Sequence, residues 1–155
     1  MFQQIVVGTD GSDGASRAVE AAIELARLSG GTLHVVSAMK APMSGAFVGP
    51  ETMAVIPTGP DWTEAARDEL DSILGRVARD AKGVGVETEL HAEIGGAADV
   101  LCQVAETVGA DLIVVGSRGM QGGRRFLGSV PNSVSHHATC SVLIVETSGK
   151  GEETA

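Results

Sequence analysis

The chain has 155 residues, in which 20 Asp and Glu against 11 Lys and Arg give a formal net charge of -9. Aromatic residues make up only 3%, so the stacking surfaces and the broad basic face of nucleic-acid-binding proteins are missing. No apolar run approaches the roughly 18 residues of a membrane-spanning helix, and the chain opens on a strand rather than a secretory signal, so we expect one cytoplasmic domain without a nucleic-acid or membrane partner.

Strands and helices alternate along the sequence. In chain order, the apolar periodicity predicts strand 3–9, helix 13–28, strand 32–38, helix 61–82, strand 84–94, helix 97–108, strand 111–115, helix 129–138 and strand 141–145. Alternating strands and helices are joined by right-handed crossovers and form a parallel sheet covered on both faces. The runs I-V-V, L-I-V-V and V-L-I-V fit strands that are buried on both sides. The sequence therefore predicts an open five-stranded α/β fold.

Two segments lie outside this alternation. Residues 39–60 contain four prolines and no clean period, which indicates a long connection. This connection is either a lid over a site or a solvent loop without function. Residues 148–155 (S-G-K-G-E-E-T-A) are polar and are predicted to be a disordered tail. The folded domain is therefore expected to span residues 1–147.

The stretch 114–134 (V-V-G-S-R-G-M-Q-G-G-R-R-F-L-G-S-V-P-N-S-V) is the most informative part of the chain. A strand breaks into a glycine-rich loop that also carries Arg118, Arg124 and Arg125, and the loop closes on Ser129-Val130-Pro131, a helix start. Glycines let backbone amides approach a ligand, and a helix N-terminus adds free N–H donors. Residues 112–145 contain no Asp or Glu. The stretch therefore predicts an anion site for phosphate; the alternative is a flexible hairpin between two buried strands.

A second loop is expected to face this one. In an open parallel sheet, ligands bind beyond the carboxyl ends of the strands, where the strand order reverses. For the order 3-2-1-4-5, the reversal lies between strand one, which ends in Gly8-Thr9-Asp10-Gly11-Ser12, and strand four, which ends in Gly116-Ser117-Arg118-Gly119. Asp10 can accept hydrogen bonds from ribose hydroxyls or hold Mg²⁺ through water. The alternative role is a helix cap, but Ser12 or Asp13 can take that role and leave Asp10 free.

These motifs resemble the universal stress protein family. The resemblance rests on I-V-V-G-T-D-G-S at the start, E-I-G-G-A-A-D-V-L in the middle, and G-S-R-G followed by G-S-V-P near the end, and it spans about residues 3–146. It implies a flavodoxin-like (Rossmann-like) fold and a homodimer joined through the last strand, Ser141–Val145. Nucleotide-binding members of the family hold ATP, and relatives hold other adenine nucleotides such as cyclic AMP.

The resemblance also assigns roles to individual residues. Gly8, Thr9 and Asp10 would lie beside the ribose and phosphates, Val35 would touch the adenine, and Val115 would line the adenine or ribose. Gly116, Ser117, Arg118 and Gly119 would hold ribose and phosphate. Gly128, Ser129 and Val130 would donate hydrogen bonds to the β- and γ-phosphates, with Ser129 also capping the helix. The family pattern has nine residues between the second glycine and the Gly-Ser pair, whereas eight separate Gly119 from Gly128 here. This shorter loop affects which nucleotide, and whether a triphosphate, fits the site.

We therefore expect a dimeric stress-response protein that binds ATP or a related adenine nucleotide, with Mg²⁺ as a candidate cofactor. It is not expected to be an enzyme, because no general base is evident beside the phosphate loop. Two alternatives stay open: a slow ATPase on the same fold, and a partner-binding dimer that holds no nucleotide. His34 and His91 are interpreted as interior or interface histidines, and Cys102 and Cys140 as small buried residues.

Overall fold

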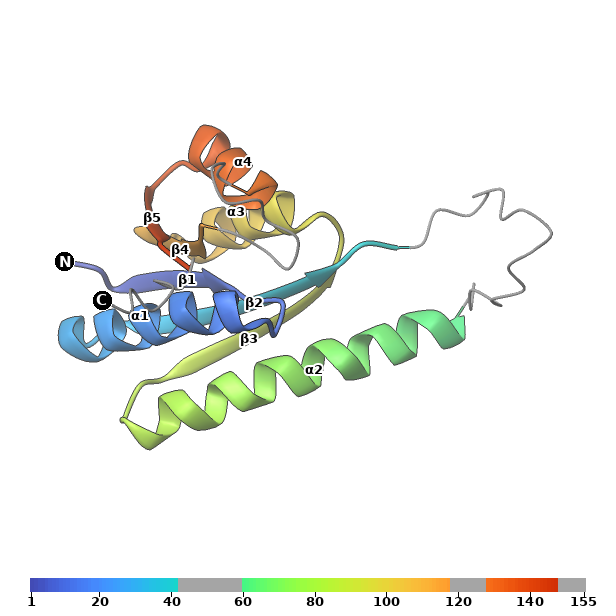
Figure 1. Cartoon of the computed structure of the whole chain (residues 1–155). Helices are drawn as coiled ribbons and strands as arrows, with labels where there is room; N and C mark the ends of the chain where they lie inside the picture. The colour runs from blue at the N-terminus through green and yellow to red at the C-terminus, as the bar shows by residue number, and fades with distance from the viewer. Residues whose placement is uncertain (42–59, 118–127, 148–155) are drawn as a thin grey trace, which may run out of the picture.

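The computed structural model describes residues 1–41, 60–117 and 128–147 of the chain (Figure 1). In chain order, the elements are β1 (Gln4–Gly8), α1 (Asp13–Ser29), β2 (Thr32–Met39), α2 (Pro60–Gly83), β3 (Thr88–Ile94), α3 (Ala97–Val108), β4 (Leu112–Gly116), α4 (Ser129–His137) and β5 (Ser141–Val145). The five strands pair in parallel in the order β3-β2-β1-β4-β5. The predicted fold class and strand order are confirmed.

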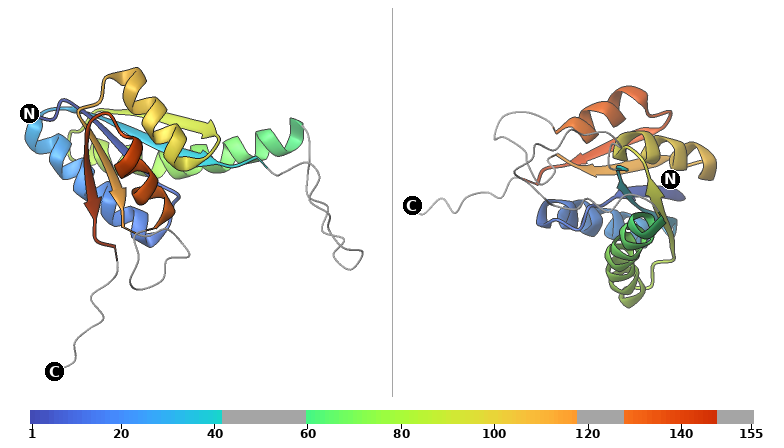
Figure 2. Two further views of the ribbon diagram at one scale, coloured as in Figure 1. Left: turned by 90° about the horizontal axis from the view of Figure 1, so that it is seen from above. Right: turned by 90° about the vertical axis from the view of Figure 1, so that its right-hand side faces the viewer.

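Helices cover both faces of the sheet. The end-on view shows α1 and α2 on one side and α3 and α4 on the other (Figure 2). Because successive side chains of a strand point to opposite faces, β1, β2 and β4 each contribute side chains to two separate cores. Val7 and Val35 belong to the core under α1 and α2, while Val6, Val36 and their neighbours belong to the core under α3 and α4. The β1 and β4 strands are buried on both sides, as their continuous apolar runs predicted. The same prediction for V-L-I-V is wrong, because β5 is an edge strand whose positions are exposed or half-buried.

One predicted boundary is wrong. The strand expected from residue 84 begins only at Thr88, because the chain after α2 first makes a tight turn. The amides of Val84 and Val86 both donate to the Ala81 carbonyl, and Gly85 has φ +77°. Val86 is nevertheless 7% exposed and packs in the core under α1 and α2. Its apolar side chain marks burial in a turn rather than membership of a strand.

The connection 42–59 and the tail 148–155 lie outside the described residues, so the predictions made for them stay predictions. Within the described ranges, none of the helices combines the length and the apolarity needed to cross a bilayer. Cys102 and Cys140 are free, half-buried and packed beside the core under α3 and α4. Burial raises the pKa of both thiols, which therefore stay protonated at neutral pH.

Candidate functional site

A cavity of about 150 Å³ lies where the carboxyl ends of β1 and β4 meet the start of α4. Segments that are far apart in the sequence meet here, because residues from β1, α1, β2, α3, β4 and the start of α4 line the cavity where the strand order reverses. Eight of the residues named from the sequence line this cavity: Gly8, Thr9, Asp10, Val115, Gly116, Gly128, Ser129 and Val130. Sequence reasoning missed the remaining lining residues: Ala15, Val36, Ala38, Ala97, Leu101 and Pro131.

The inner wall of this cavity is apolar and tightly built. Val36 and Leu101 are each 2% exposed and form it together with Val115. Gly8 sits against the same wall: a Cβ placed there would lie 3.0 and 3.1 Å from the two terminal methyl groups of Leu101. Glycine at the end of β1 therefore permits the close approach of Leu101 on α3.

The loop after β1 holds its shape through its own side chains. The Ser12 hydroxyl accepts a hydrogen bond from the Ala15 amide at 3.2 Å and caps α1, as one of the two sequence alternatives foresaw. Asp10 is exposed, but it is not free of local contacts, because its Oδ1 accepts the Ser12 amide at 2.9 Å. One carboxylate oxygen of Asp10 thus shapes the turn at the mouth of the cavity.

The start of α4 differs from the sequence expectation. Its N-cap is Gly128, with φ −58° and ψ 162°, whereas Ser129 is the first helical residue. The Gly128 amide donates to the Ser117 carbonyl at 2.9 Å, so this donor is already engaged. No side chain caps α4, and Pro131 has no N–H. The first-turn amides at the cavity are therefore those of Ser129 and Val130, which carry the partial positive charge of the helix end.

Two of the residues named from the sequence, Ser117 and Val35, do not line the cavity. Ser117 is 7% exposed and instead joins the ends of β4 and β5: its amide donates to the Val145 carbonyl at 2.8 Å, and its hydroxyl accepts the Thr147 amide at 3.0 Å. The Val35 side chain packs in the opposite core, and Val36 lines the cavity. The alternation of side chains along β2 is the signal that separates these two valines. Arg118 and Gly119 lie outside the described residues.

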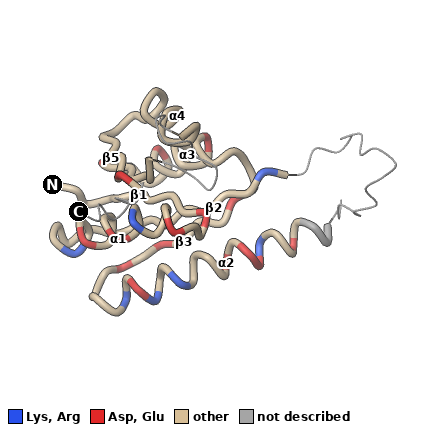
Figure 3. The backbone as a smooth tube through the Cα atoms, in the orientation of Figure 1, with Lys and Arg blue, Asp and Glu red and all other residues tan. Residues whose placement is uncertain are grey.

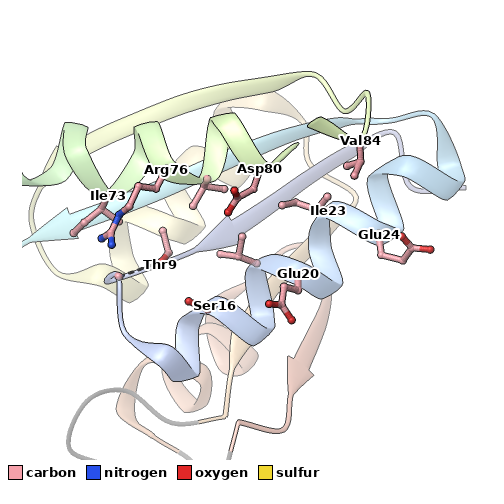
Figure 4. A pocket seen from close by; sticks show the side chains of 12 residues that line it. Thr9, Ser16, Glu20, Ile23, Glu24, Ile73, Arg76, Asp80 and Val84 are labelled. Carbon is pink, nitrogen blue, oxygen red and sulfur yellow. Dashed lines mark hydrogen bonds between the residues drawn. The ribbon is translucent and has the colours of Figure 1, made fainter. Parts of the chain in front are cut away.

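A larger cavity, of about 450 Å³, lies between α1 and α2 (Figure 4). Glu20 and Glu24 on α1 and Asp80 on α2 line it, with Arg76 as the one guanidinium among its described lining residues. A hydrogen bond from Arg27 lowers the pKa of Glu24, which is ionised at neutral pH. Because Glu24 is paired with Arg27, the Glu20 and Asp80 carboxylates face the single cation Arg76, and this excess of negative charge repels a phosphate. The smaller cavity, where Asp10 is the one acidic side chain among the lining residues and α4 carries no acidic residue (Figure 3), suits an anion better.

Comparison with known proteins agrees with this architecture. The profile of the universal stress protein family matches residues 1–146. Universal stress protein YxiE of Bacillus subtilis is 32% identical over 151 residues, which cover 94% of this chain and 99% of that protein.

Two solved structures of this kind contain nucleotides. A universal stress protein in complex with cAMP is 32% identical, with a TM-score of 0.72, and the match covers 95% of this chain and 99% of that one. The universal stress protein of Archaeoglobus fulgidus in complex with dAMP is 27% identical, with a TM-score of 0.63, over 92% of this chain and 97% of that one. Given the family match over nearly its whole length, the chain belongs to the universal stress protein family.

Proposed function

We propose that this protein binds an adenine nucleotide in the cavity between the ends of β1 and β4 and the start of α4, and that it acts as a homodimeric, cytoplasmic regulator in a stress response. The observation that carries the proposal is the convergence of eight residues, named from the sequence, around one cavity. Relatives in complex with cAMP and dAMP support the adenine nucleotide as the ligand class.

The two ends of the cavity suit the two ends of a nucleotide. Val36, Leu101 and Val115 offer an apolar wall for the base, and the amides of Ser129 and Val130 offer donors for a phosphate. A cavity near 150 Å³ holds about one benzene-sized ring, while whole ligand sites usually measure about 300–1,000 Å³. We therefore expect the cavity to take part of the nucleotide, with the rest extending over the loop ends, where Arg118 and Gly119 follow β4 in the sequence.

Asp10 is proposed to hold the ribose. Its carboxylate is the one acidic group among the described lining residues, and its Oδ1 is already bound to the Ser12 amide. Mg²⁺ is usually held by one or two carboxylates together with phosphate oxygens and water. If ATP is the ligand, Asp10 fits the role of a water-mediated partner of Mg²⁺ beside the phosphates.

Asp10→Asn tests the ribose contact without removing the turn. The amide oxygen of Asn can still accept the Ser12 amide, but the negative charge is lost. Because hydrogen bonds to charged groups contribute about 1.5–3 kcal/mol, affinity for AMP should fall roughly tenfold or more. Isothermal titration calorimetry measures this, with Asp13→Asn in the first turn of α1 as the charge-matched control. Unchanged or tighter binding by Asp10→Asn would reduce Asp10 to a turn residue.

The protein is proposed to bind nucleotide without rapid turnover. Among the described lining residues there is no His, Lys or Cys, so Asp10 alone would have to position both the metal and the attacking water. Incubation with excess ATP and Mg²⁺ should therefore release phosphate no faster than a protein-free control. Faster release that Asp10→Ala abolishes would favour the slow ATPase.

The homodimer is proposed to form through β5, which is one edge of the sheet. Such an edge presents backbone donors and acceptors to a second strand, and Leu143 on β5 is 38% exposed. The wild type should sediment at twice the chain mass of 15.8 kDa, and Leu143→Lys should sediment as a monomer. Leu28→Lys, at the 69% exposed Leu28 of α1, is the control and should stay dimeric. A Leu143→Lys dimer as tight as the wild type would rule out this interface.

Mass spectrometry of the native protein tests the proposal as a whole. We expect an adenine nucleotide to copurify with the wild type, and its identity would name the physiological ligand. Recovery of a different class of small molecule, displaced by no adenine nucleotide, would contradict the proposed function.

A further inference from the structure

Three side chains that do not line the nucleotide cavity gather on the sheet. His34 on β2 pairs in register with Glu89 on β3, and His91 follows two residues later on the same face of β3. His34 is 2% exposed, His91 is half-buried, and the Glu89 side chain is 62% exposed. One ligand atom from each residue lies within 4.8 Å of the other two. The His34 side of the group is therefore buried, and the Glu89 side forms a rim exposed to solvent.

The distances match those between the ligands of one metal ion. Nδ1 of His34 lies 3.2 Å from Nε2 of His91 and 3.4 Å from Oε2 of Glu89. Two ligands about 2.0–2.1 Å from a tetrahedral Zn²⁺ are separated by about 3.3 Å. Two histidines with one glutamate are also a donor set that zinc uses where a coordination position is left open for water.

Gln4 on β1 fixes the tautomer that a metal requires. Its Oε1 lies 2.7 Å from Nε2 of His34, and a carbonyl oxygen can only accept, so the Nε2 atom carries the proton. The Nδ1 atom of His34 then presents a lone pair toward the cluster. Metal-binding histidines are usually held in this way, with the second ring nitrogen donating to an oxygen of a neighbouring group.

His34 faces a carboxylate oxygen of Glu89 across the pairing of β2 with β3. Its Nδ1 lone pair and the Glu89 carboxylate then oppose each other as two acceptors at 3.4 Å. Glu93 lies on the same face of β3, two residues beyond His91, and β3 shows as acidic in Figure 3. A divalent cation between the three ligand atoms would relieve this opposition.

We propose that His34, Glu89 and His91 form a binding site for one divalent transition metal ion, with Zn²⁺ as the best match, and that water from the exposed rim completes its coordination. Gln4 is the positioning residue of this site. The proposal does not rest on the nucleotide cavity, so either can fail without the other. The competing explanation is a hydrogen bond between the two histidines that exists for packing alone.

Titration of the nucleotide-free full chain with Zn²⁺, by calorimetry, and with Co²⁺, by visible absorption, tests the site. We expect one ion per chain and the visible spectrum of a nitrogen- and oxygen-liganded Co²⁺ of low coordination number. His91→Ala should weaken Zn²⁺ binding at least about tenfold, and Glu89→Gln by a similar factor, because metal affinity depends on the number of ligands present. His136→Ala, at an exposed histidine of α4, is the matched control and should bind as the wild type does.

The substitutions His91→Ala and Glu89→Gln are at half-buried or exposed positions, so we expect the fold to survive. Circular dichroism checks that it does. For the positioning residue, Gln4→Leu should weaken Zn²⁺ binding about 10–100-fold, and Gln4→Glu, which keeps an acceptor for His34, should restore it. Equal Zn²⁺ affinity of the wild type and His91→Ala, or loss of binding with His136→Ala instead, would overturn the proposal.

Discussion

Gly8→Val is expected to reduce affinity for an adenine nucleotide at least about 100-fold, equivalent to about 2.8 kcal/mol. The Cβ alone would lie 3.0 and 3.1 Å from the terminal methyl groups of Leu101. Leu101 is 2% exposed and packs in the core under α3 and α4, so its neighbours leave it little freedom. The free space beside this contact is the cavity, and valine together with the displaced Leu101 methyls would occupy it.

Gly128→Val approaches the same cavity from the opposite wall. Gly128 has φ −58° and ψ 162°, a conformation that any residue adopts, so the backbone need not move. The two variants should therefore lose AMP and cAMP binding in calorimetry while circular dichroism reports an intact fold. Gly75→Ala is the control, because a Cβ on that α2 residue meets no atom within 4 Å. Wild-type affinity in both valine variants would refute the assignment of the cavity.

Gly31→Ala is expected to destabilise the fold by about 1–3 kcal/mol or more, the usual cost of overpacking. A Cβ at Gly31 would lie 2.6 Å from the Phe2 carbonyl oxygen and 2.9 Å from that of Gln3. These are backbone atoms and cannot rotate away. The Gln3 carbonyl also accepts the Thr32 amide at 2.9 Å where β2 begins beside β1. Relieving the clash would disturb the first pairing of the two central strands.

Urea denaturation measures this loss as a lower midpoint. Gly75→Ala should move the midpoint in the other direction, with a gain of about 0.5–1 kcal/mol, because it replaces a glycine inside a helix and meets open space. The opposite signs separate crowding at Gly31 from a general effect of replacing glycine. If Gly31→Ala matched the wild-type midpoint, the close packing of β1 against the start of β2 would be wrong.

The arrangement of the fold follows from the sequence because alternating strands and helices restrict the topology severely. The runs around Val6 and Val114 were predicted to lie in strands buried on both faces, and they do. The equally apolar run of β5 lies at the sheet edge with Leu143 38% exposed, so an apolar run alone does not identify a buried strand. The start of β3 could not be predicted in this way. Val86 is buried, but hydrophobicity reports burial and not the backbone conformation, and the turn depends on hydrogen bonds to Ala81.

The position of the cavity was predictable for a similar reason, because the reversal of strand order brings the loops after β1 and β4 together. Details that depend on strand register or on competing hydrogen bonds could not be predicted from the sequence. Val36, rather than Val35, faces the cavity, and the Gly128 amide is engaged by Ser117. The cluster of His34 and His91 could not be predicted either, because the two histidines are 57 positions apart in the sequence and only the register of β2 with β3 brings them together.

The Ser129 and Val130 amides at the start of α4 are proposed to bind the phosphate of an adenine nucleotide, and the Asp10 carboxylate at the end of β1 to bind its ribose. The direct test is a titration of isotope-labelled protein with AMP, followed by amide resonances in two-dimensional NMR spectra. We expect saturable shifts of the Ser129 and Val130 amide resonances together with those of Thr9 and Asp10. Shifts confined to residues that line the cavity between α1 and α2, or an unchanged spectrum with every adenine nucleotide tried, would contradict this proposal.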